Sequence, residues 1–267
     1  MEIVGIDAGG SLLKIAYVEH GRYRYKWFPI DEMDQALSWM KRLKPAARYR
    51  ITGGRAAKVK EKLTGADVTF IPEFDSVCIG TRELLVEEGK EPKSDFLIVS
   101  IGTGTSFFLM KGERYERLLG SGIGGGVISG LSRLILQESN FYQIVDLAKK
   151  GDRSHVDLLV KDLYGEEAPP ILGDVTAANF GNPDLSRARK KDAAAALFQL
   201  IGETIVLLAK QCAELHQVDT CVYVGAAISQ NPPLQQIIQS FDSMTGLQSI
   251  FLSNGSFTGA LGAILYQ

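Results

Sequence analysis

The feature that most constrains this chain is a strand–glycine turn–strand pattern at its start, MEIVGIDAGGSLLKIA. Apolar residues 3–6 have the length of a buried strand, Asp7 stands at its end, residues 8–11 make a tight turn, and a second apolar run follows. Glycines let the backbone approach a bulky anion, and a carboxylate at a strand end can hold Mg²⁺. The pattern is typical of a phosphate-binding hairpin beside a metal, and an ordinary tight hairpin with a solvated Asp7 stays equally open.

The same pattern recurs in the middle of the chain. Residues 96–101 (FLIVSI) form an apolar run, residues 102–106 (GTGTS) form a turn rich in donors, and residues 107–110 (FFLM) return. Two such hairpins without close sequence identity predict a duplicated α/β unit. Facing each other across a cleft, the two turns would clamp a nucleotide triphosphate from both sides.

Apolar periodicity predicts the remaining elements. Residues 131–181 are expected to be mostly helical and irregular. Strands are expected at 22–29, 49–51, 68–72, 221–224 and 250–252, and helices at 32–43 (with Asp31 as N-cap), 58–63, 75–88, 192–216, from Pro232 onward, and at 257–266.

The polar stretch 91–94 (EPKS) is the best candidate for a domain boundary. It separates an N-terminal domain, residues 1–94, from a C-terminal domain, residues 95–267. Each domain opens on one of the two hairpins. The last helix is free to pack back on the first domain.

Composition narrows the function classes. The 267 residues are 45% hydrophobic and 22% charged, as in soluble globular proteins of one or two domains. The net charge of −2 gives no electrostatic support for nucleic-acid binding. We expect no membrane helix, which needs about 18 apolar residues, and no signal peptide. Three scattered cysteines favour a reducing cytosol, and three scattered histidines disfavour zinc chemistry and Ser-His-Asp hydrolysis.

The densest glycine run, residues 120–126 (GSGIGGG), leads into a helical stretch. Free N–H groups and the positive end of the helix dipole would make this start an anion site. A flexible linker is the alternative, although linkers do not usually run straight into an apolar helix. A dinucleotide site is rejected because the run does not follow a strand in a Rossmann arrangement with a downstream ribose acid.

Three further positions carry candidate chemistry. Glu73, between Pro72 and Phe74, can be partly desolvated and accept a proton from a substrate hydroxyl, or can be a solvent-facing acid or a favourable charge at a helix start. Arg117 suits a carboxylate or a developing phosphoryl charge, or is a surface cation. Residues 225–227 (GAA) can lie under an adenine ring or simply pack a strand on a helix.

Taken together, these segments resemble the type II pantothenate kinases of the staphylococcal and bacillus-like kind, within the acetate and sugar kinase/Hsp70/actin superfamily. The resemblance implies an α/β fold of the duplicated actin-like (ribonuclease H-like) ATPase type, with a nucleotide cleft between two domains. It also implies ATP-dependent phosphorylation of the primary hydroxyl of pantothenate to 4'-phosphopantothenate, the first step of coenzyme A synthesis, by a cytoplasmic homodimer using Mg²⁺. The resemblance lies in GIDAGGSLLKI, ITGG, PEFDS, IGTGTS, GSGIGGG, GDRS, PPILGDVTAANFG and VYVGAAIS, in order over nearly the whole chain.

Site roles follow from this resemblance by position. It implies Glu73 as the catalytic base, Asp7 as the Mg²⁺ anchor, Arg117 as the arginine that holds the substrate and the reacting groups, and Ser106 as a substrate contact. The implied nucleotide contacts are Asp7, Ala8, Gly9, Gly10, Ser11, Leu12, Leu13, Lys14, Thr103, Gly125, Gly126, Val127, Ile128, Ser129, Phe141 and Ala226.

The chain departs from the staphylococcal pattern at four of the nucleotide-side positions. Ser11 and Ile123 stand where Thr is usual, Phe141 where Tyr is expected, and Ala226 where Ser is expected. These departures loosen the implied nucleotide contacts but leave the base and both hairpins intact. Two alternatives to the pantothenate kinase function stay open. One is a related sugar or amino-sugar kinase, which usually presents an Asp base in a different local pattern. The other is a nucleotide-binding regulator without phosphoryl transfer, which would need neither the base nor the arginine.

Overall fold

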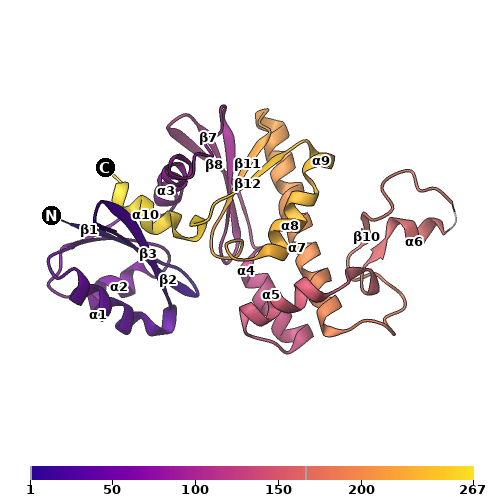
Figure 1. Ribbon diagram of the computed structural model, residues 1–267, viewed down its shortest axis with the longest axis horizontal. Helices are drawn as coiled ribbons and strands as arrows, with labels where there is room; N and C mark the ends of the chain where they lie inside the picture. The colour runs from indigo at the N-terminus through magenta and orange to yellow at the C-terminus, as the bar shows by residue number, and fades with distance from the viewer. Residues whose placement is uncertain (1, 166) are drawn as a thin grey trace.

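The computed structural model describes residues 2–165 and 167–267 and contains two five-stranded sheets of identical topology (Figure 1). In each sheet a three-stranded antiparallel meander is followed by two strands that run parallel to its first strand. The duplicated unit expected from the two hairpins is confirmed. The first sheet contains β1 (Ile3–Ala8), β2 (Leu12–Glu19), β3 (Arg22–Pro29), β4 (Arg48–Thr52) and β5 (Val68–Phe70), and the second contains β6 (Phe96–Ile101), β7 (Thr105–Lys111), β8 (Arg114–Ser121), β11 (Thr220–Val224) and β12 (Gln248–Phe251).

Helices separate and cover the two sheets, so that helix and sheet layers alternate along the molecule (Figure 1). Helices α1 (Met33–Leu43) and α2 (Ala56–Lys62) pack on the outer face of the first sheet. Helices α3 (Glu73–Glu87) and α10 (Thr258–Leu265) lie between the sheets. The far face of the second sheet is covered by α4 (Gly125–Leu131), α5 (Phe141–Lys150), α7 (Lys190–His216) and α8 (Pro232–Ser240), and α9 (Asp242–Thr245) follows α8.

The C-terminal helix α10 packs on the first sheet and on α3, although it comes last in the sequence. Arg50 of β4 helps to hold it, because its Nη1 donates a hydrogen bond of 2.8 Å to the carbonyl of Ile264. The last helix and the first strand of the chain are consequently neighbours (Figure 1). Three glycines allow the close approach, because an added Cβ would overlap a carbonyl oxygen: Gly262 with Ser76 at 1.8 Å, Gly5 with Ala260 at 1.9 Å and Gly80 with Thr258 at 2.0 Å.

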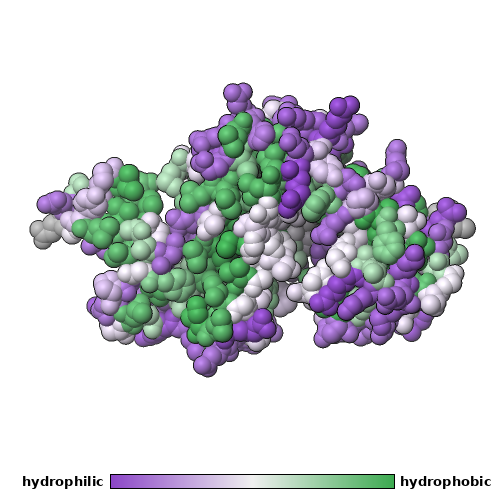
Figure 2. Space-filling view, turned by 180° about the vertical axis from the view of Figure 1, so that it is seen from behind, coloured by the Kyte–Doolittle hydropathy of each residue, from purple (hydrophilic) through white to green (hydrophobic). Residues whose placement is uncertain are grey.

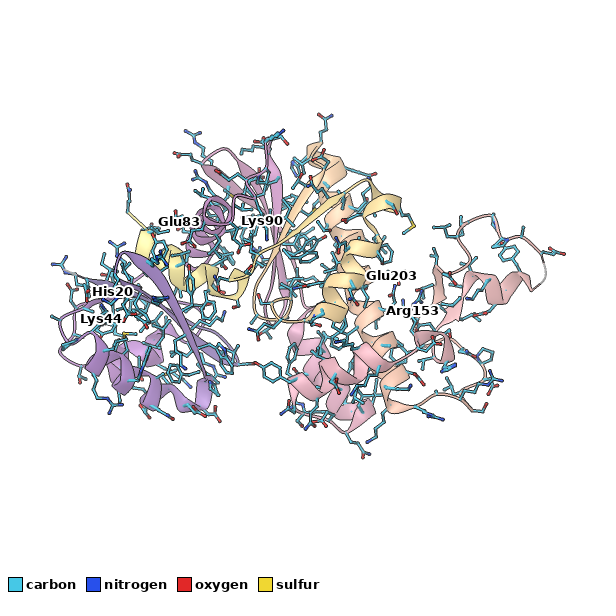
Figure 3. The ribbon with its side chains drawn as sticks, in the orientation of Figure 1. His20, Lys44, Glu83, Lys90, Arg153 and Glu203 are labelled. Atoms are coloured by element: carbon cyan, nitrogen blue, oxygen red, sulfur yellow. The ribbon has the colours of Figure 1, made fainter. Side chains whose placement is uncertain are left out.

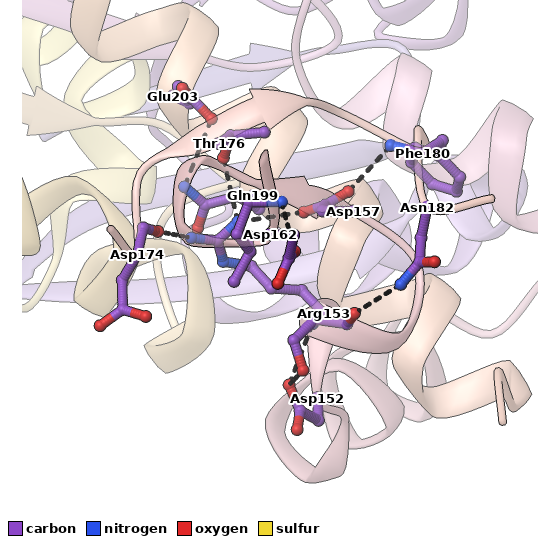
Figure 4. Close-up of polar contacts among 12 residues, drawn as sticks. Asp152, Arg153, Asp157, Asp162, Asp174, Thr176, Phe180, Asn182, Gln199 and Glu203 are labelled. Atoms are coloured by element: carbon purple, nitrogen blue, oxygen red, sulfur yellow. Dashed lines mark hydrogen bonds and ion pairs between the residues drawn. The ribbon is translucent and has the colours of Figure 1, made fainter. Parts of the chain in front are cut away.

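An arm extends from the far end of the molecule, between α5 and α7 (Figure 1). Its centre is the fully buried Asp157, which accepts hydrogen bonds from Arg153 Nη1 (3.2 Å) and the Phe180 amide (2.9 Å) (Figure 4). Burial raises the pKa of this carboxyl, and these two bonds oppose the rise. The stretch is helical and irregular as expected, but the expectation missed a small two-stranded sheet of β9 (Leu158–Leu159) and β10 (Thr176–Ala178) beside the short α6 (Val160–Tyr164).

Helix α7 is long and apolar enough, by length and composition, to cross a membrane, which the sequence analysis did not expect. In the structure 61% of its most apolar window is buried inside the protein. It packs against α5, α8 and the second sheet. This is the environment of the core helix of a soluble protein.

Two helix starts differ from expectation. Asp31 is not an N-cap: it lies within a 3-10 turn (Ile30–Glu32), and α1 begins at Met33 without a side-chain cap. Helix α3 begins at Glu73 rather than at Asp75. Pro72, with extended backbone, occupies the N-cap position, and the helix begins at the next residue.

Strand β8 was not predicted, and it carries an irregularity that matters for the site. Phe107 lies opposite Leu119, but Phe108 lies opposite Arg117, so Leu118 is an extra residue in the ladder. Such a bulge changes the alternation of the strand. As a result Arg117 and Gly120, three residues apart, lie on the same face of the sheet.

Candidate functional site

A cleft of about 890 Å³ opens between the two sheets, with both glycine turns in its wall. Seen from behind, the molecule is hollowed between the first-sheet part and the rest, and pale residues of intermediate hydropathy border the hollow (Figure 2). The two turns touch, because a Cβ on Gly10 would lie only 3.0 Å from Thr103 Oγ1. The two corners therefore do face each other.

Most of the sequence-predicted site residues come together in this cleft. Ala8, Leu13, Val127 and Ile128 do not line it, and the side chains of all but Val127 are fully buried in the hydrophobic cores. These four residues lie behind the cleft wall rather than at its surface. The predicted residues that line the cleft are Asp7, Gly9, Gly10, Ser11, Leu12, Lys14, Glu73, Thr103, Ser106, Arg117, Gly125, Gly126, Ser129, Phe141 and Ala226.

The turn tips offer backbone N–H groups to the cleft. In the first hairpin the amide of Gly9 donates to the carbonyl of Leu12, which closes the turn. Within the described chain, no hydrogen-bond acceptor is found for the amides of Gly10 and Ser11 at the first tip or of Thr103 and Gly104 at the second. Free amides at a tight turn form a concavity that suits an anion.

The start of α4, at the end of the glycine run, does not supply free amides, which corrects the sequence-based expectation. The amides of Gly125 and Gly126 donate to the carbonyls of Gly102 (2.9 Å) and Thr103 (2.8 Å) in the second turn. The next two amides of α4 both donate to the carbonyl of Gly124. The start of α4 is thus bound to the second hairpin, and its glycines permit this close packing, since a Cβ on Gly125 would lie 2.9 Å from the Gly102 oxygen.

Asp7 and Lys14 form an ion pair at the floor of the cleft. They lie opposite each other in the β1–β2 ladder, and Lys14 Nζ donates to Asp7 Oδ2 at 2.7 Å. The two side chains are only 13% and 12% exposed. Glycines enclose the carboxylate, because a Cβ on Gly53 would lie 2.7 Å from Oδ1 and one on Gly259 would lie 2.9 Å from Oδ2. Close backbone packing and the Lys14 bond therefore both restrict this carboxylate.

The oxygen ligands around Asp7 suit Mg²⁺, and they are too few to hold a metal ion by protein side chains alone. Groups of three or more potential metal-binding side chains are not found within residues 2–165 and 167–267. Mg²⁺ commonly binds through one or two carboxylates and completes its shell with water and substrate phosphates. Asp7 Oδ1 is an oxygen ligand that the Lys14 bond leaves unused.

Glu73 is the first residue of α3, and its side chain enters the cleft although it is exposed. The surrounding cleft walls partly desolvate the carboxyl and raise its pKa above the ordinary 4.5. The negative charge of Asp7 raises it further, while the ammonium of Lys14 lowers it. A carboxylate with a raised pKa is a better proton acceptor.

Arg117 enters the same cleft from β8. Its Cζ lies 5.0 Å from the centre of the Phe74 ring, a cation–π contact. Among the described residues no carboxylate pairs with its guanidinium. It is therefore available to an anionic ligand.

Sequence reasoning missed several polar and aromatic residues of the cleft. Two of them could have been found from the strand register. Ser100 lies opposite Ser106 and Trp27 lies opposite Lys14, and Ser106 and Lys14 had been predicted as site residues. Ser121 ends β8, which was not predicted, and the remaining ones come from helices and loops that no local pattern ties to the hairpins. The missed residues with polar groups in their side chains are Trp27, Ser100, Ser121, Arg133, Tyr142, Ser229, Gln230, Ser256 and Thr258.

Solved structures with the same architecture share little sequence with this chain. An activator of 2-hydroxyisocaproyl-CoA dehydratase from Clostridium difficile has a TM-score of 0.67 at 14% identity, covering 100% of this chain and 94% of that one. Component A of (R)-2-hydroxyglutaryl-CoA dehydratase from Acidaminococcus fermentans has a TM-score of 0.68 at 14% identity, covering 100% and 97%. A ROK family glucokinase from Streptomyces griseus has 0.56 at 13%, covering 99% and 98%. The fold is the duplicated actin-like ATPase fold.

Proteins found by sequence comparison share a much larger fraction of identical residues with this chain. A type II pantothenate kinase of Oceanobacillus iheyensis is 43% identical over 266 residues, 99% of each chain. Enzymes of the same name from Bacillus cereus and Staphylococcus saprophyticus are 36% and 34% identical, covering 98% of this chain and 96% and 98% of theirs. The Fumble family model matches residues 3–266. By this match over nearly its full length, the chain belongs to the Fumble family, the family of the type II pantothenate kinases.

Proposed function

We propose that this protein is a kinase that transfers the γ-phosphoryl group of ATP to the primary hydroxyl of pantothenate, giving 4'-phosphopantothenate for coenzyme A synthesis. The relatives that match along the whole chain bear the name of this activity. The observation that carries the proposal is the placement of Glu73, with its raised pKa, in the cleft that both glycine turns enter. A regulator that only bound nucleotide would have no use for such a carboxylate.

Phosphoryl transfer depends mainly on positioning and on neutralising charge. The free amides of the two turns would hold the phosphates, and Asp7 would hold Mg²⁺, which neutralises phosphate charge when bound. Glu73 takes the proton of the substrate hydroxyl as its oxygen bonds to the γ-phosphorus, and the bond to the leaving ADP oxygen breaks. Arg117 binds the acceptor carboxylate or the charge that develops on the transferred group, with Ser106 beside it.

The remaining nucleotide contacts are assigned by their place in the cleft. Thr103, Gly125, Gly126 and Ser129 line it where α4 meets the second turn, and Phe141 at the start of α5 and Ala226 after β11 line it as well. They would surround the nucleoside. Ala8, Leu13, Val127 and Ile128 do not line the cleft, and we assign them the role of supporting the contact residues from behind its wall.

The proposal extends to a cytoplasmic homodimer. Its support is the long helix α7, which exposes Leu207 and Leu215 to solvent at 51% and 80% of their surface. Residues eight apart lie on one face of a helix. A second copy of the chain would cover such a face.

The decisive test measures ADP release from Mg-ATP with pantothenate, and separately with a panel of hexoses and amino sugars. We expect turnover with pantothenate alone. Turnover only with a sugar would keep the fold and replace the substrate. ATP binding without turnover on any of them would support a regulator and contradict the kinase proposal.

The raised pKa of Glu73 predicts a pH dependence. Because the base must be ionised, kcat/KM should fall as the pH drops through this pKa, so the acidic limb should lie above pH 4.5. Lys14→Met removes a charge that lowers the pKa, and the limb should move to higher pH. Lys58→Met, an exposed lysine on α2, should leave the limb in place. A limb that stays unmoved in Lys14→Met would contradict Glu73 as the base.

A further inference from the structure

The bulge in β8 shapes the binding position of the Arg117 side chain, a seat formed by Gly120 on one side and Phe74 on the other. It brings Gly120 onto the face that Arg117 occupies, and the guanidinium packs against this glycine: a Cβ there would lie 2.4 Å from Arg117 Nη2. Phe108, opposite Arg117 in the ladder, lies on the same face. A substituent on Gly120 would therefore displace the guanidinium.

Phe74 forms the other wall of this seat. Its ring lies under the guanidinium, 5.0 Å from Arg117 Cζ, and against Phe108, with 5.4 Å between ring centres. Phe108 is buried, which anchors the stack in the core between the sheets. Phe74 does not itself line the cleft. Any influence it has on a ligand passes through its neighbours Glu73 and Arg117.

The same cluster is tied to α3 at a second point. The ring of Tyr115 packs edge-on against Phe108 at 5.9 Å, and its hydroxyl donates to Asp75 Oδ1. Asp75 and Phe74 belong to the first turn of α3, which begins with Glu73. Two contacts thus join the turn that carries Glu73 to the strand that carries Arg117, across the space between the sheets.

We infer that Phe74 is a positioning residue for the proposed reaction: its ring fixes the Arg117 guanidinium relative to the Glu73 carboxylate. The inference rests on the proposed function and adds a residue to it. Arginine suits this arrangement because its planar guanidinium can stack on a ring while its edge still donates hydrogen bonds to an anion. A misplaced guanidinium would bind the acceptor poorly and leave the nucleotide side of the cleft intact.

The test compares two similar cation–π pairs in the same protein. Phe74→Leu should lower kcat/KM for pantothenate by about 5- to 30-fold while the KM for ATP stays within twofold. Phe74→Tyr, which keeps the ring, should restore activity. The control is Phe70→Leu on β5. Phe70 has a similar cation–π contact, with Lys60 Nζ 5.0 Å from the ring centre, and a similar exposure of 47% against 40% for Phe74, but it does not line the cleft. Phe70→Leu should therefore change neither kcat/KM for pantothenate nor the KM for ATP.

Two further variants separate positioning from a general loss of stability. Gly120→Ala pushes the guanidinium from its other side and should reproduce the loss for pantothenate with the ring intact. In an Arg117→Lys background, which cannot stack as a plane, Phe74→Leu should cost less than twofold. An equal loss in both backgrounds, or equal effects of Phe74→Leu and Phe70→Leu, would overturn the inference.

A spectroscopic readout is independent of the substrate. The ring current of Phe74 should shift the Arg117 Nε–Hε signal in nuclear magnetic resonance spectra, and Phe74→Leu should remove that shift, with the signal assigned by Arg117→Lys. An unchanged signal would refute the stacked arrangement. If the unaltered protein released no ADP with pantothenate, the proposed function would fail, while this signal would still decide whether Phe74 orients Arg117.

Discussion

Glu73→Gln should lower kcat by about 10²- to 10⁴-fold, the contribution of a positioned general base. Glutamine keeps the size of the side chain but cannot accept the hydroxyl proton. ATP affinity should remain within about twofold or improve slightly, because the substitution removes a negative charge beside Asp7. The rate is measured by ADP release at saturating pantothenate, and ATP binding by calorimetry.

The control is Glu83→Gln, on the same helix but outside the cleft (Figure 3). It should retain the full rate, since no ligand reaches it. If Glu73→Gln kept more than a tenth of the rate, the carboxylate would have to be reassigned to holding the substrate. A parallel loss of ATP binding would point instead to a change in the first turn.

Gly262→Ala should destabilise the protein more than any exposed substitution. A Cβ on this residue would lie 1.8 Å from the Ser76 carbonyl oxygen, so α10 and α3 must move apart. Overpacking typically lowers the free energy of unfolding by about 1–3 kcal/mol, and a contact this short places the cost at the upper end of that range or beyond. The gain in helix propensity from glycine to alanine is only about 1 kcal/mol. We expect a net loss of about 2 kcal/mol and a Tm lower by about 4–8 °C.

Gly130→Ala is the matched control, because it adds the same methyl group to another helix, α4, where no atom lies within 4 Å of the added Cβ. Only the propensity gain remains, so Tm should stay unchanged or rise slightly. Equal behaviour of the two variants in a thermal scan would show that the contact between α10 and α3 can yield. Activity should fall in Gly262→Ala alone, since Ser76 lies one turn beyond Glu73.

Local patterns in the sequence were sufficient to predict the two hairpins. Each hairpin combines an apolar run with a glycine turn, and its register follows from the turn, which pairs Asp7 with Lys14. Strand β8 escaped prediction because the bulge at Leu118 breaks the alternation of the strand. With Arg114, Glu116 and Arg117 close together, the segment resembles a polar loop.

The partners of the glycine run could not be predicted from its own residues. Whether the amides of Gly125 and Gly126 are free depends on where the second turn, more than twenty residues earlier, comes to lie. The contact between Phe74 and Arg117 is hidden for the same reason, since it joins α3 to β8, two elements more than forty residues apart in the sequence. Residue type and spacing indicated which residues share the cleft, and the packing of the sheets decided which of their atoms remain available.

The place of α10 has a consequence for the order in which the protein folds during synthesis. Strands β1, β2 and β4 leave the ribosome early, but the helix that packs beside Gly5 and accepts the Arg50 hydrogen bond is made last. At about 5–20 residues per second, this delay is on the order of ten seconds or more. Throughout that time one face of the nascent sheet lacks part of its cover. A circular permutant that places α10 ahead of β1 would complete this half first, and α10 already packs on β1 in the folded protein.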